Sequence, residues 1–205
     1  MREGPGGSAS EWTGVVLAGG RSRRFGGVDK TRLPLGGRTL LQRAVQALAP
    51  LTRTCVVVGG PPAAAGANVP TLPDAYPGEG PLGGILTALE AIETSHALVL
   101  AVDLPFIPGA VLESLRRAGA GAEVAVLQHA DGRLALCLAA RRTCVPALRD
   151  AWQAGRRRVR DLALAAPVTV VTVDESCDPR ALWNVNDPLT YARALEMTEH
   201  DCPAC

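Results

Sequence analysis

The sequence predicts a single α/β domain built on a mostly parallel sheet with helices on both faces. Short apolar runs rich in β-branched residues alternate along the chain with stretches of helical hydrophobic spacing. Such alternation is typical of βαβ units, whose strands are buried on both faces and therefore read as continuous apolar runs. A length of 205 residues suits one domain of this kind with a sizeable core.

The first half of the chain contains the clearest elements. A strand is expected at residues 12–17, because this run is too short for a helix and stops at Gly19-Gly20. Residues 38–48 place apolar side chains at helical spacing before a proline. Residues 55–58 and 69–72 then predict two further strands. Together these segments form the first strand-helix-strand unit.

A glycine-rich loop at residues 74–84 leads into a helix that reaches about Ile92, and residues 97–102 form the most apolar strand. The second half is less regular and predicts helices at 110–118, 145–154, 159–164 and 188–197 and strands at 124–127, 134–139 and 168–173. Ligands of parallel sheets lie beyond the carboxyl ends of the strands. The loops expected to converge there are 18–30, 59–62, 74–84 and 103–108.

No repeat or linker divides the chain. We expect residues 1–10 to be a disordered leader, residues 11–197 to be the folded domain, and residues 198–205 to be a polar tail. The tail contains Cys202 and Cys205 in a C-x-x-C, which alone cannot complete a four-ligand zinc site. An exposed thiol pair and an adventitious metal site both remain open.

The composition excludes several classes of partner. With 21 basic and 20 acidic residues, the formal net charge of +1 provides no field to hold nucleic acid or a membrane surface. No apolar run is long enough to span a membrane, and the first residues lack the apolar core of a signal peptide. A soluble cytoplasmic protein is therefore expected. The internal cysteines expected to be small buried hydrophobes are Cys55, Cys137 and Cys144.

The stretch from Val15 to Leu35 indicates the chemistry. Its glycines can take positive φ and bring backbone N–H groups close to an anion, while its arginines and Lys30 add positive charge. This combination suits a triphosphate. Neither the G-x-G-x-x-G dinucleotide fingerprint nor the G-x-x-x-x-G-K-[ST] P-loop is present at its required spacing. A phosphate-binding loop of another type is therefore predicted.

The motifs of this stretch resemble those of the nucleotidyltransferase family that includes molybdenum cofactor guanylyltransferase. The shared motifs are L-A-G-G, an arginine pair, G-G and D-K, found here at Leu17–Gly20, Arg23-Arg24, Gly26-Gly27 and Asp29-Lys30. The resemblance extends from Thr13 to about Leu195. It implies a Rossmann-like domain of the nucleotide-diphospho-sugar transferase type.

The activity implied by this resemblance is transfer of GMP from Mg²⁺-bound GTP to the phosphate of molybdopterin or the molybdenum cofactor, with release of pyrophosphate. Transient contact with proteins that assemble molybdoenzymes is implied as well. On the donor side, the resemblance implies that Lys30 and Arg24 bind phosphates and stabilise the leaving pyrophosphate. The backbone residues implied to contact the nucleotide are Leu17, Ala18, Gly19 and Gly20.

Two aspartates complete the implied donor site. Asp103 directly follows the most apolar strand, where a carboxylate is costly unless it has a partner such as a divalent metal. A turn or helix N-cap is the alternative role, and the family's D-x-P pattern favours Mg²⁺. Asp74 corresponds to the guanine-nucleotide site of the family. It could instead stabilise the turn of its own loop.

The acceptor side depends on looser matches. Asn184 and Asn186 match an N-x-N that faces the acceptor in the family, and alternate residues of an extended segment point the same way. Their alternative role is to form a turn before the last helix. Arg157 and Arg158 match a G-x-R-R segment beside the pterin, although without the resemblance a solvated charge run at a helix end would be the simpler interpretation.

Two departures from the family pattern are visible. Gly59-Gly60 stands where relatives often present an asparagine to the nucleotide, and Leu134-Ala135 stands where they usually carry glutamine or histidine followed by proline. A cytidylyltransferase acting on the same cofactor, or on another phosphorylated acceptor, is the nearest alternative. A non-catalytic nucleotide-binding regulator is an alternative of another class. The presence of both Lys30 and Asp103 favours an enzyme.

Overall fold

A computed structural model describes residues 11–19, 25, 28–60, 69–174 and 178–199. The expected leader, the tail beyond Glu199 and the C-x-x-C cysteines lie outside these residues. So do several residues of the predicted phosphate loop, namely Gly20, Arg23, Arg24, Gly26 and Gly27.

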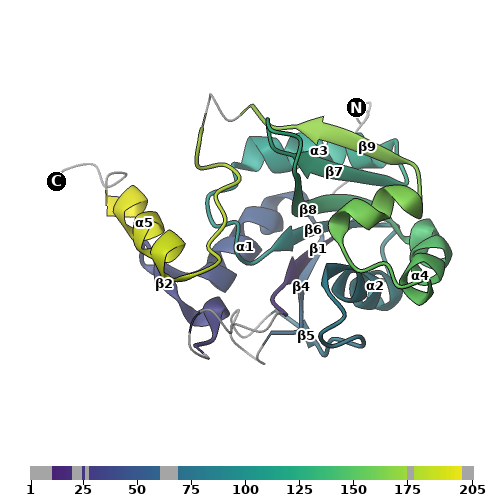
Figure 1. Cartoon of the computed structure of the whole chain (residues 1–205), viewed down its shortest axis with the longest axis horizontal. Helices are drawn as coiled ribbons and strands as arrows, with labels where there is room; N and C mark the ends of the chain where they lie inside the picture. Colours follow the sequence, from purple (N-terminus) through teal and green to yellow (C-terminus); the bar gives the residue numbers. More distant parts are fainter. Residues whose placement is uncertain (1–10, 20–24, 26–27, 61–68, 175–177, 200–205) are drawn as a thin grey trace.

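One seven-stranded sheet forms the centre of the domain, in the order β5-β4-β1-β6-β8-β7-β9 (Figure 1). The strands are β1 Trp12–Leu17, β4 Thr54–Val58, β5 Thr71–Leu72, β6 His96–Ala101, β7 Val124–Gln128, β8 Leu134–Arg141 and β9 Val168–Thr172. Strand β8 pairs antiparallel with β6 and β7, whereas the other neighbours pair in parallel. The mostly parallel sheet predicted from the apolar runs is confirmed.

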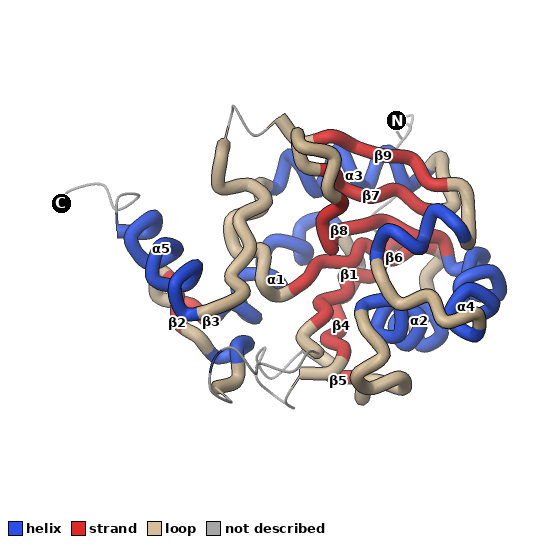
Figure 2. Tube along the Cα trace, viewed as in Figure 1, coloured by secondary structure: helices blue, strands red, loops and turns tan. Residues whose placement is uncertain are grey.

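Helices cover both faces of this sheet (Figure 2). The covering helices are α1 Leu40–Leu48, α2 Pro81–Ala91, α3 Gly109–Ala120 and α4 Val145–Gln153, and a further helix, α5, spans Pro188–Glu199. Within β1, Val16 packs in the hydrophobic cluster that contains residues of α1 and α3, and Val15 packs in the cluster that contains residues of α2 and α4. Alternate residues of a strand point to opposite faces, which explains why the central strands are apolar throughout.

The first helix begins later than its hydrophobic spacing predicts. Residues 38–39 form β3, which pairs antiparallel with β2 (Pro34–Leu35) through a turn at Gly36-Gly37. The Thr39 hydroxyl then accepts a hydrogen bond from the Gln42 amide, and the Gln42 side chain accepts one from the Thr39 amide. This capping box starts α1 at Leu40.

Two other features differ from or add to the predicted elements. Residues 159–164 form a 3₁₀ helix, η6, instead of an α-helix. Helix α5 does not cover the sheet but lies beside the β2–β3 hairpin (Figures 1 and 2). In the described part of the chain, no helix is sufficiently long and apolar to cross a membrane.

The three internal cysteines are buried, as predicted. Burial raises the pKa of the Cys144 thiol to about 12 and also raises the pKa of Cys137. Because the thiolate is the reactive form of cysteine, these side chains are inert packing groups at neutral pH.

Replacing Gly119 by alanine tests how closely α3 packs on β8. A Cβ at Gly119 would lie 2.4 Å from the Cβ of Ala139, and both residues belong to regular elements. Overpacking of this kind costs roughly 1–3 kcal/mol. We expect Gly119→Ala to lower the free energy of unfolding in urea by that amount. Gly109→Ala is the matched control, because a Cβ there meets no atom within 4 Å; equal effects at both positions would contradict the packing argument.

Candidate functional site

The carboxyl ends of four parallel strands lie side by side. Leu17 of β1 is in register with Val58 of β4 and with Ala101 of β6, and Val58 is in register with Leu72 of β5. The loops that follow these strands therefore start at the same edge of the sheet. This arrangement brings the L-A-G-G motif, Asp74 and Asp103 to one site, as the sequence predicted.

The L-A-G-G turn is fixed by the neighbouring strand. The amides of Ala18 and Gly19 both donate to the Val58 carbonyl oxygen, at 2.9 and 3.1 Å. These two N–H groups are therefore hydrogen-bonded within the protein and fix the position of the turn. The carbonyl oxygens of Ala18 and Gly19 accept no hydrogen bond from a described residue, so they remain available to a ligand that donates.

Close backbone packing explains the glycines after β4. A Cβ on Gly59 would lie only 2.9 Å from the Cα of Gly19, and Gly59 has a φ of +72°. A Cβ on Gly60 would meet the side chains of Val57 and Ala18 at 2.9 and 3.0 Å. The pair at residues 59–60, which departs from the family pattern, therefore lets the β4 loop approach the β1 loop. Sequence reasoning missed this contact, although two adjacent glycines after a strand are a signal for close approach.

Asp74 performs the turn role that the sequence offered as one of two alternatives, and it leaves one carboxylate oxygen facing the candidate site. Its Oδ1 accepts hydrogen bonds from the Tyr76 amide at 2.9 Å and from the Thr87 hydroxyl at 3.2 Å, which is an Asx-type turn supported by α2. Its Oδ2 faces the β1 loop, 3.7 Å from the place that a Cβ of Gly19 would take. One oxygen therefore holds the loop while the other faces the candidate site.

Lys30 and Asp103 form an ion pair at the centre of the site. Lys30 Nζ lies 3.5 Å from Asp103 Oδ2, and the two side chains are only 17% and 20% exposed. Burial raises the pKa of Asp103 above the ordinary aspartate value, and the nearby Lys30 opposes this rise. Lys30 begins the 3₁₀ turn η3 (Lys30–Arg32), whose N-cap is Asp29. The D-K motif thus pairs a capping residue with a site residue.

Two buried oxygen atoms at this edge have no hydrogen-bond partner among the described residues: Asp103 Oδ1 and Asn184 Oδ1. The Val185 amide donates to the Asp103 carbonyl oxygen at 2.9 Å, which brings the N-x-N segment next to Asp103. Unpaired buried oxygens are costly, and an oxygen of this kind is a ligand that a divalent cation prefers. No cluster of three or more His, Cys, Asp or Glu among the described residues could hold a metal, so any ion here needs ligands from the substrate or water.

Asn186 lies next to the start of α5. Its backbone amide and that of Asp187 donate to the Thr190 hydroxyl, at 3.0 and 3.1 Å, and the Thr190 amide donates to Asp187 Oδ1 at 2.8 Å. Asp187 therefore caps the first turn of α5. The Asn186 side chain is exposed and takes no part in this cap.

The Arg157 side chain is held by contacts within the protein. Its guanidinium forms an ion pair with Glu79, donates to the Trp152 carbonyl oxygen at 2.5 Å and lies 4.9 Å from the centroid of the Trp152 ring. Its own carbonyl oxygen accepts from the Leu82 amide at 3.4 Å. These contacts hold the loop before α2, and none joins Arg157 to the Lys30–Asp103 pair. Arg158 is exposed.

Leu134-Ala135, the second departure from the family pattern, belongs partly to the core. Leu134 and Ala135 begin β8, where Ala135 is 5% exposed and Leu134 packs against the cluster on the α2 face. Their side chains therefore contribute to packing.

Of the residues predicted for the donor side, Arg24 and Gly20 lie outside the described part of the chain.

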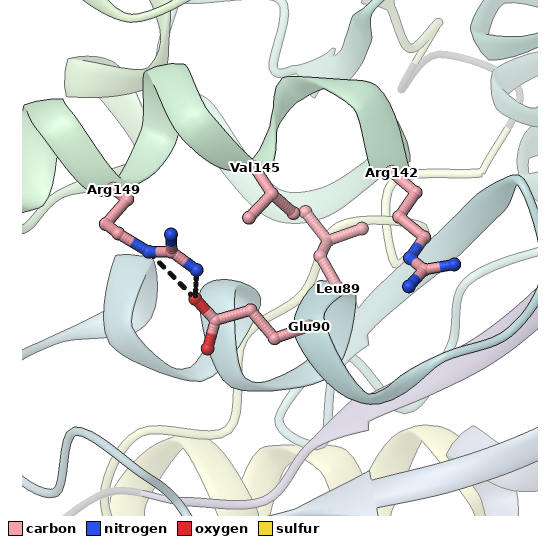
Figure 3. A pocket seen from close by; sticks show the side chains of 5 residues that line it. All are labelled: Leu89, Glu90, Arg142, Val145 and Arg149. Carbon is pink, nitrogen blue, oxygen red and sulfur yellow. Dashed lines mark hydrogen bonds and ion pairs between the residues drawn. The ribbon is translucent and has the colours of Figure 1, made fainter.

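A cavity of about 360 Å³ lies elsewhere, between α2 and α4 (Figure 3). An ion pair of 2.7 Å between Arg149 and Glu90 closes one side, and Arg142 lies on the other. Because α2 connects two parallel strands, its last turn with Leu89 and Glu90 returns to the opposite edge of the sheet. This cavity is therefore separate from the candidate site.

Residues 14–170 match the model of the MobA-like NTP transferase domain. The chain belongs to this family. The molybdenum cofactor guanylyltransferase of Cereibacter sphaeroides is 36% identical over 194 residues, covering 92% of this chain and 97% of that protein. A probable molybdenum cofactor guanylyltransferase of Chloroflexus aggregans is also 36% identical, covering 89% of this chain and 86% of the relative.

Solved structures agree with this membership of the MobA-like family. The molybdopterin-guanine dinucleotide biosynthesis protein A of Archaeoglobus fulgidus superimposes with a TM-score of 0.73 at 25% identity, covering 92% of this chain and 99% of that one. The 2-C-methyl-D-erythritol 4-phosphate cytidylyltransferase of Thermus thermophilus shares the fold, with a TM-score of 0.67 at 20% identity and coverage of 90% and 98%. The fold is therefore that of the nucleotide-diphospho-sugar transferases, as predicted, and this MobA-like chain is a nucleotidyltransferase.

Substitution of Gly59 tests the close contact between the β1 and β4 loops. Gly59→Ala would place a methyl group 2.9 Å from Gly19 in addition to the strain of a positive φ, which costs roughly 1–2 kcal/mol. We expect binding of GTP, measured by calorimetry, to weaken at least about tenfold because the L-A-G-G turn is displaced.

Gly78→Ala is the matched control for this substitution. Gly78 also has a positive φ of +82°, but a Cβ there meets no atom within 4 Å. It should therefore show the backbone strain alone and bind GTP normally. If both variants lost GTP binding equally, the contact with Gly19 would not be responsible.

Proposed function

We propose that this protein transfers GMP from GTP to the terminal phosphate of molybdopterin or the molybdenum cofactor, releasing pyrophosphate. The observation that carries the proposal is the Lys30–Asp103 pair, which lies at the strand edge that also presents the L-A-G-G turn and Asp74. The names of the relatives that are 36% identical over most of the chain support the choice of nucleotide and acceptor.

Lys30 and Asp103 serve the phosphates. Lys30 binds them and stabilises the charge that develops on the leaving pyrophosphate, together with Arg24. Asp103 holds Mg²⁺ through its unpartnered Oδ1, and the neighbouring Asn184 oxygen is a second ligand. Mg²⁺ usually takes one or two protein oxygens and completes its shell with phosphate oxygens and water, which fits this donor set. When bound, the ion neutralises charge on the nucleotide phosphates.

The guanine is recognised beside β1. The free Oδ2 of Asp74 accepts the N–H groups of guanine N1 and N2, while Oδ1 keeps the carboxylate in place through Tyr76 and Thr87. The carbonyl oxygens of Ala18 and Gly19 accept from the nucleoside. Cytosine lacks adjacent ring N–H and amino donors of this kind, so the arrangement favours GTP over CTP.

The acceptor side lies toward α5. Its phosphate is already anionic and can attack the α-phosphorus without a general base, so alignment is the main requirement. Asn186 and Arg158 have exposed side chains and are assigned to the acceptor. Arg157, which the resemblance also assigns to the acceptor, holds the loop before α2 through Glu79 and the Trp152 carbonyl oxygen. Transient contact with molybdoenzyme assembly proteins would follow from the nature of the product.

The direct test is pyrophosphate release from GTP, CTP or ATP, with Mg²⁺, in the presence and absence of molybdopterin. GTP with molybdopterin should be turned over fastest. In this assay, Asp103→Asn should lower kcat about 10²–10³-fold, because one preorganised charged group at the phosphates is lost. The variant should remain folded, since asparagine has nearly the same shape as aspartate, and a thermal melt checks this.

Two comparisons make this result specific. Asp131→Asn is the control, because Asp131 is an exposed carboxylate paired with Arg133 in a turn, and its rate should be normal. Asn184→Ala should raise the Mg²⁺ concentration needed for half-maximal rate. Preference for CTP would assign the chain to the cytidylyltransferases, and absence of pyrophosphate with every nucleotide would leave a regulatory nucleotide binder. A normal rate of Asp103→Asn would remove the metal assignment.

A further inference from the structure

The candidate site is bounded on one side by α5 and the β2–β3 hairpin, which lie apart from the sheet (Figures 1 and 2). We propose that Tyr191 and Phe25 are positioning residues that hold Lys30 in register with the segment carrying Asn184 and Asn186. The proposal rests on the proposed function of Lys30 as a phosphate-binding residue. It adds two aromatic residues, of which Phe25 lies between the motif residues of the stretch from Val15 to Leu35 and Tyr191 lies on α5.

The first step links the acceptor segment to α5. The Thr190 hydroxyl accepts from the amides of Asn186 and Asp187, and the Tyr191 amide donates to the Asp187 carbonyl oxygen at 3.0 Å. The indole N–H of Trp183 donates to the Thr190 carbonyl oxygen at 3.2 Å. The segment therefore folds back on the first turn of α5, and any shift of this turn moves the segment with it.

The second step links α5 to the phosphate side of the site. The Tyr191 hydroxyl donates to the Pro34 carbonyl oxygen at 2.5 Å, in the strand β2 that follows η3. The Tyr191 ring also meets the ring of Phe25 edge-on, with centroids 6.4 Å apart and an interplanar angle of 70°. Phe25 is 9% exposed, so its ring is shielded from water.

The third step reaches the lysine. Lys30 Nζ lies 5.8 Å from the centroid of the Phe25 ring, within range of a cation–π interaction, and 3.5 Å from Asp103 Oδ2. The Asp103 carbonyl oxygen accepts from the Val185 amide, which belongs to the acceptor segment. The contacts therefore form a closed ring that runs from Asp103 through the acceptor segment, Tyr191, Phe25 and Lys30 back to Asp103.

This ring has a consequence for the reaction. A lysine has a long stem with many rotamers, and fixing it between a carboxylate and a ring face reduces the freedom that phosphate binding would otherwise have to remove. Group transfer also requires the nucleophile, phosphorus and leaving group to be aligned. Asp103, Phe25 and Tyr191 therefore position Lys30 on the donor side and the two asparagines on the acceptor side.

A double-mutant cycle on nucleotide binding tests the proposal. The ligand is Mg²⁺ with a GTP analogue that has a methylene bridge between the α and β phosphorus atoms, and the readout is its dissociation constant. Tyr191→Leu should weaken binding about fivefold in the native background, a loss typical of one partly buried cation–π contact. In a Lys30→Met background the same substitution should change the constant less than about twofold, because Tyr191 acts through Lys30. Equal weakening in both backgrounds, or none in the native one, would overturn the proposal.

Three further variants keep this test decisive. Phe25→Leu keeps a buried apolar side chain but removes the ring under Lys30, so it should reproduce the cycle even if Tyr191→Leu does not fold. Tyr191→Phe removes only the hydroxyl to Pro34 and should weaken binding less than Tyr191→Leu. Leu189→Ala is the matched control on α5, because its side chain is 66% exposed, and it should bind normally. A cycle for Phe25→Leu equal in both backgrounds would also overturn the proposal.

The binding cycle separates this proposal from the proposed function. Binding of the analogue is measured without an acceptor, so a native protein that binds it but releases no pyrophosphate from GTP with molybdopterin refutes only the transfer activity. Where turnover is present, Tyr191→Leu should lower kcat more than it raises the KM for molybdopterin, since alignment is lost. With kcat expressed per mole of folded protein, a substitution that merely destabilised the fold would leave both constants unchanged.

Discussion

The pairing of Asp103 with Lys30 is the interaction on which the arrangement of the site depends. Asp103 follows the central strand β6 and is largely buried, so its charge is stable only with a nearby cation. Lys30 supplies this cation. It lies in the 3₁₀ turn η3, which Asp29 caps and which the strand β2 follows. The pair thus joins the strand edge to the phosphate loop, while the second carboxylate oxygen stays unpaired and suits a metal.

Most of the fold could be predicted because its strands are buried on both faces. Such strands read as continuous apolar runs, and their order in the chain alternates with helices, so seven strands and five α-helices were located with errors of a few residues at their ends. The β2–β3 hairpin was missed because two-residue strands carry no periodicity. The placement of α5 against this hairpin, and the 3₁₀ form of residues 159–164, depend on tertiary contacts that spacing does not encode.

The site was predictable only where a motif marks it. The residues 17–19, Lys30, Asp74 and Asp103 belong to motifs that follow strands, and the sheet register brings their strands together. In a run of arginines, by contrast, the sequence cannot tell which side chain turns inward. Arg157 does so because its guanidinium forms an ion pair with Glu79, which is distant in sequence, and stacks on the ring of Trp152, which belongs to α4. Tyr191 and Phe25 were missed because their contacts join segments that are distant in sequence, and each residue alone looks like an ordinary core aromatic residue.

The two halves of the proposed site are held in place by different parts of the fold. The proposed nucleotide side lies at the ends of β1, β4, β5 and β6, whose register is fixed by the sheet, so its geometry tolerates little change. The proposed acceptor side lies on the segment before α5, which is attached to the sheet edge by the Val185–Asp103 hydrogen bond and to the hairpin by Tyr191. Ala135 is buried and Leu134 packs against the hydrophobic cluster on the α2 face, so the departure from the family pattern at these residues falls on packing positions. In the proposed mechanism, the position of the acceptor therefore depends on the contacts of the segment before α5 with the sheet edge and with the hairpin.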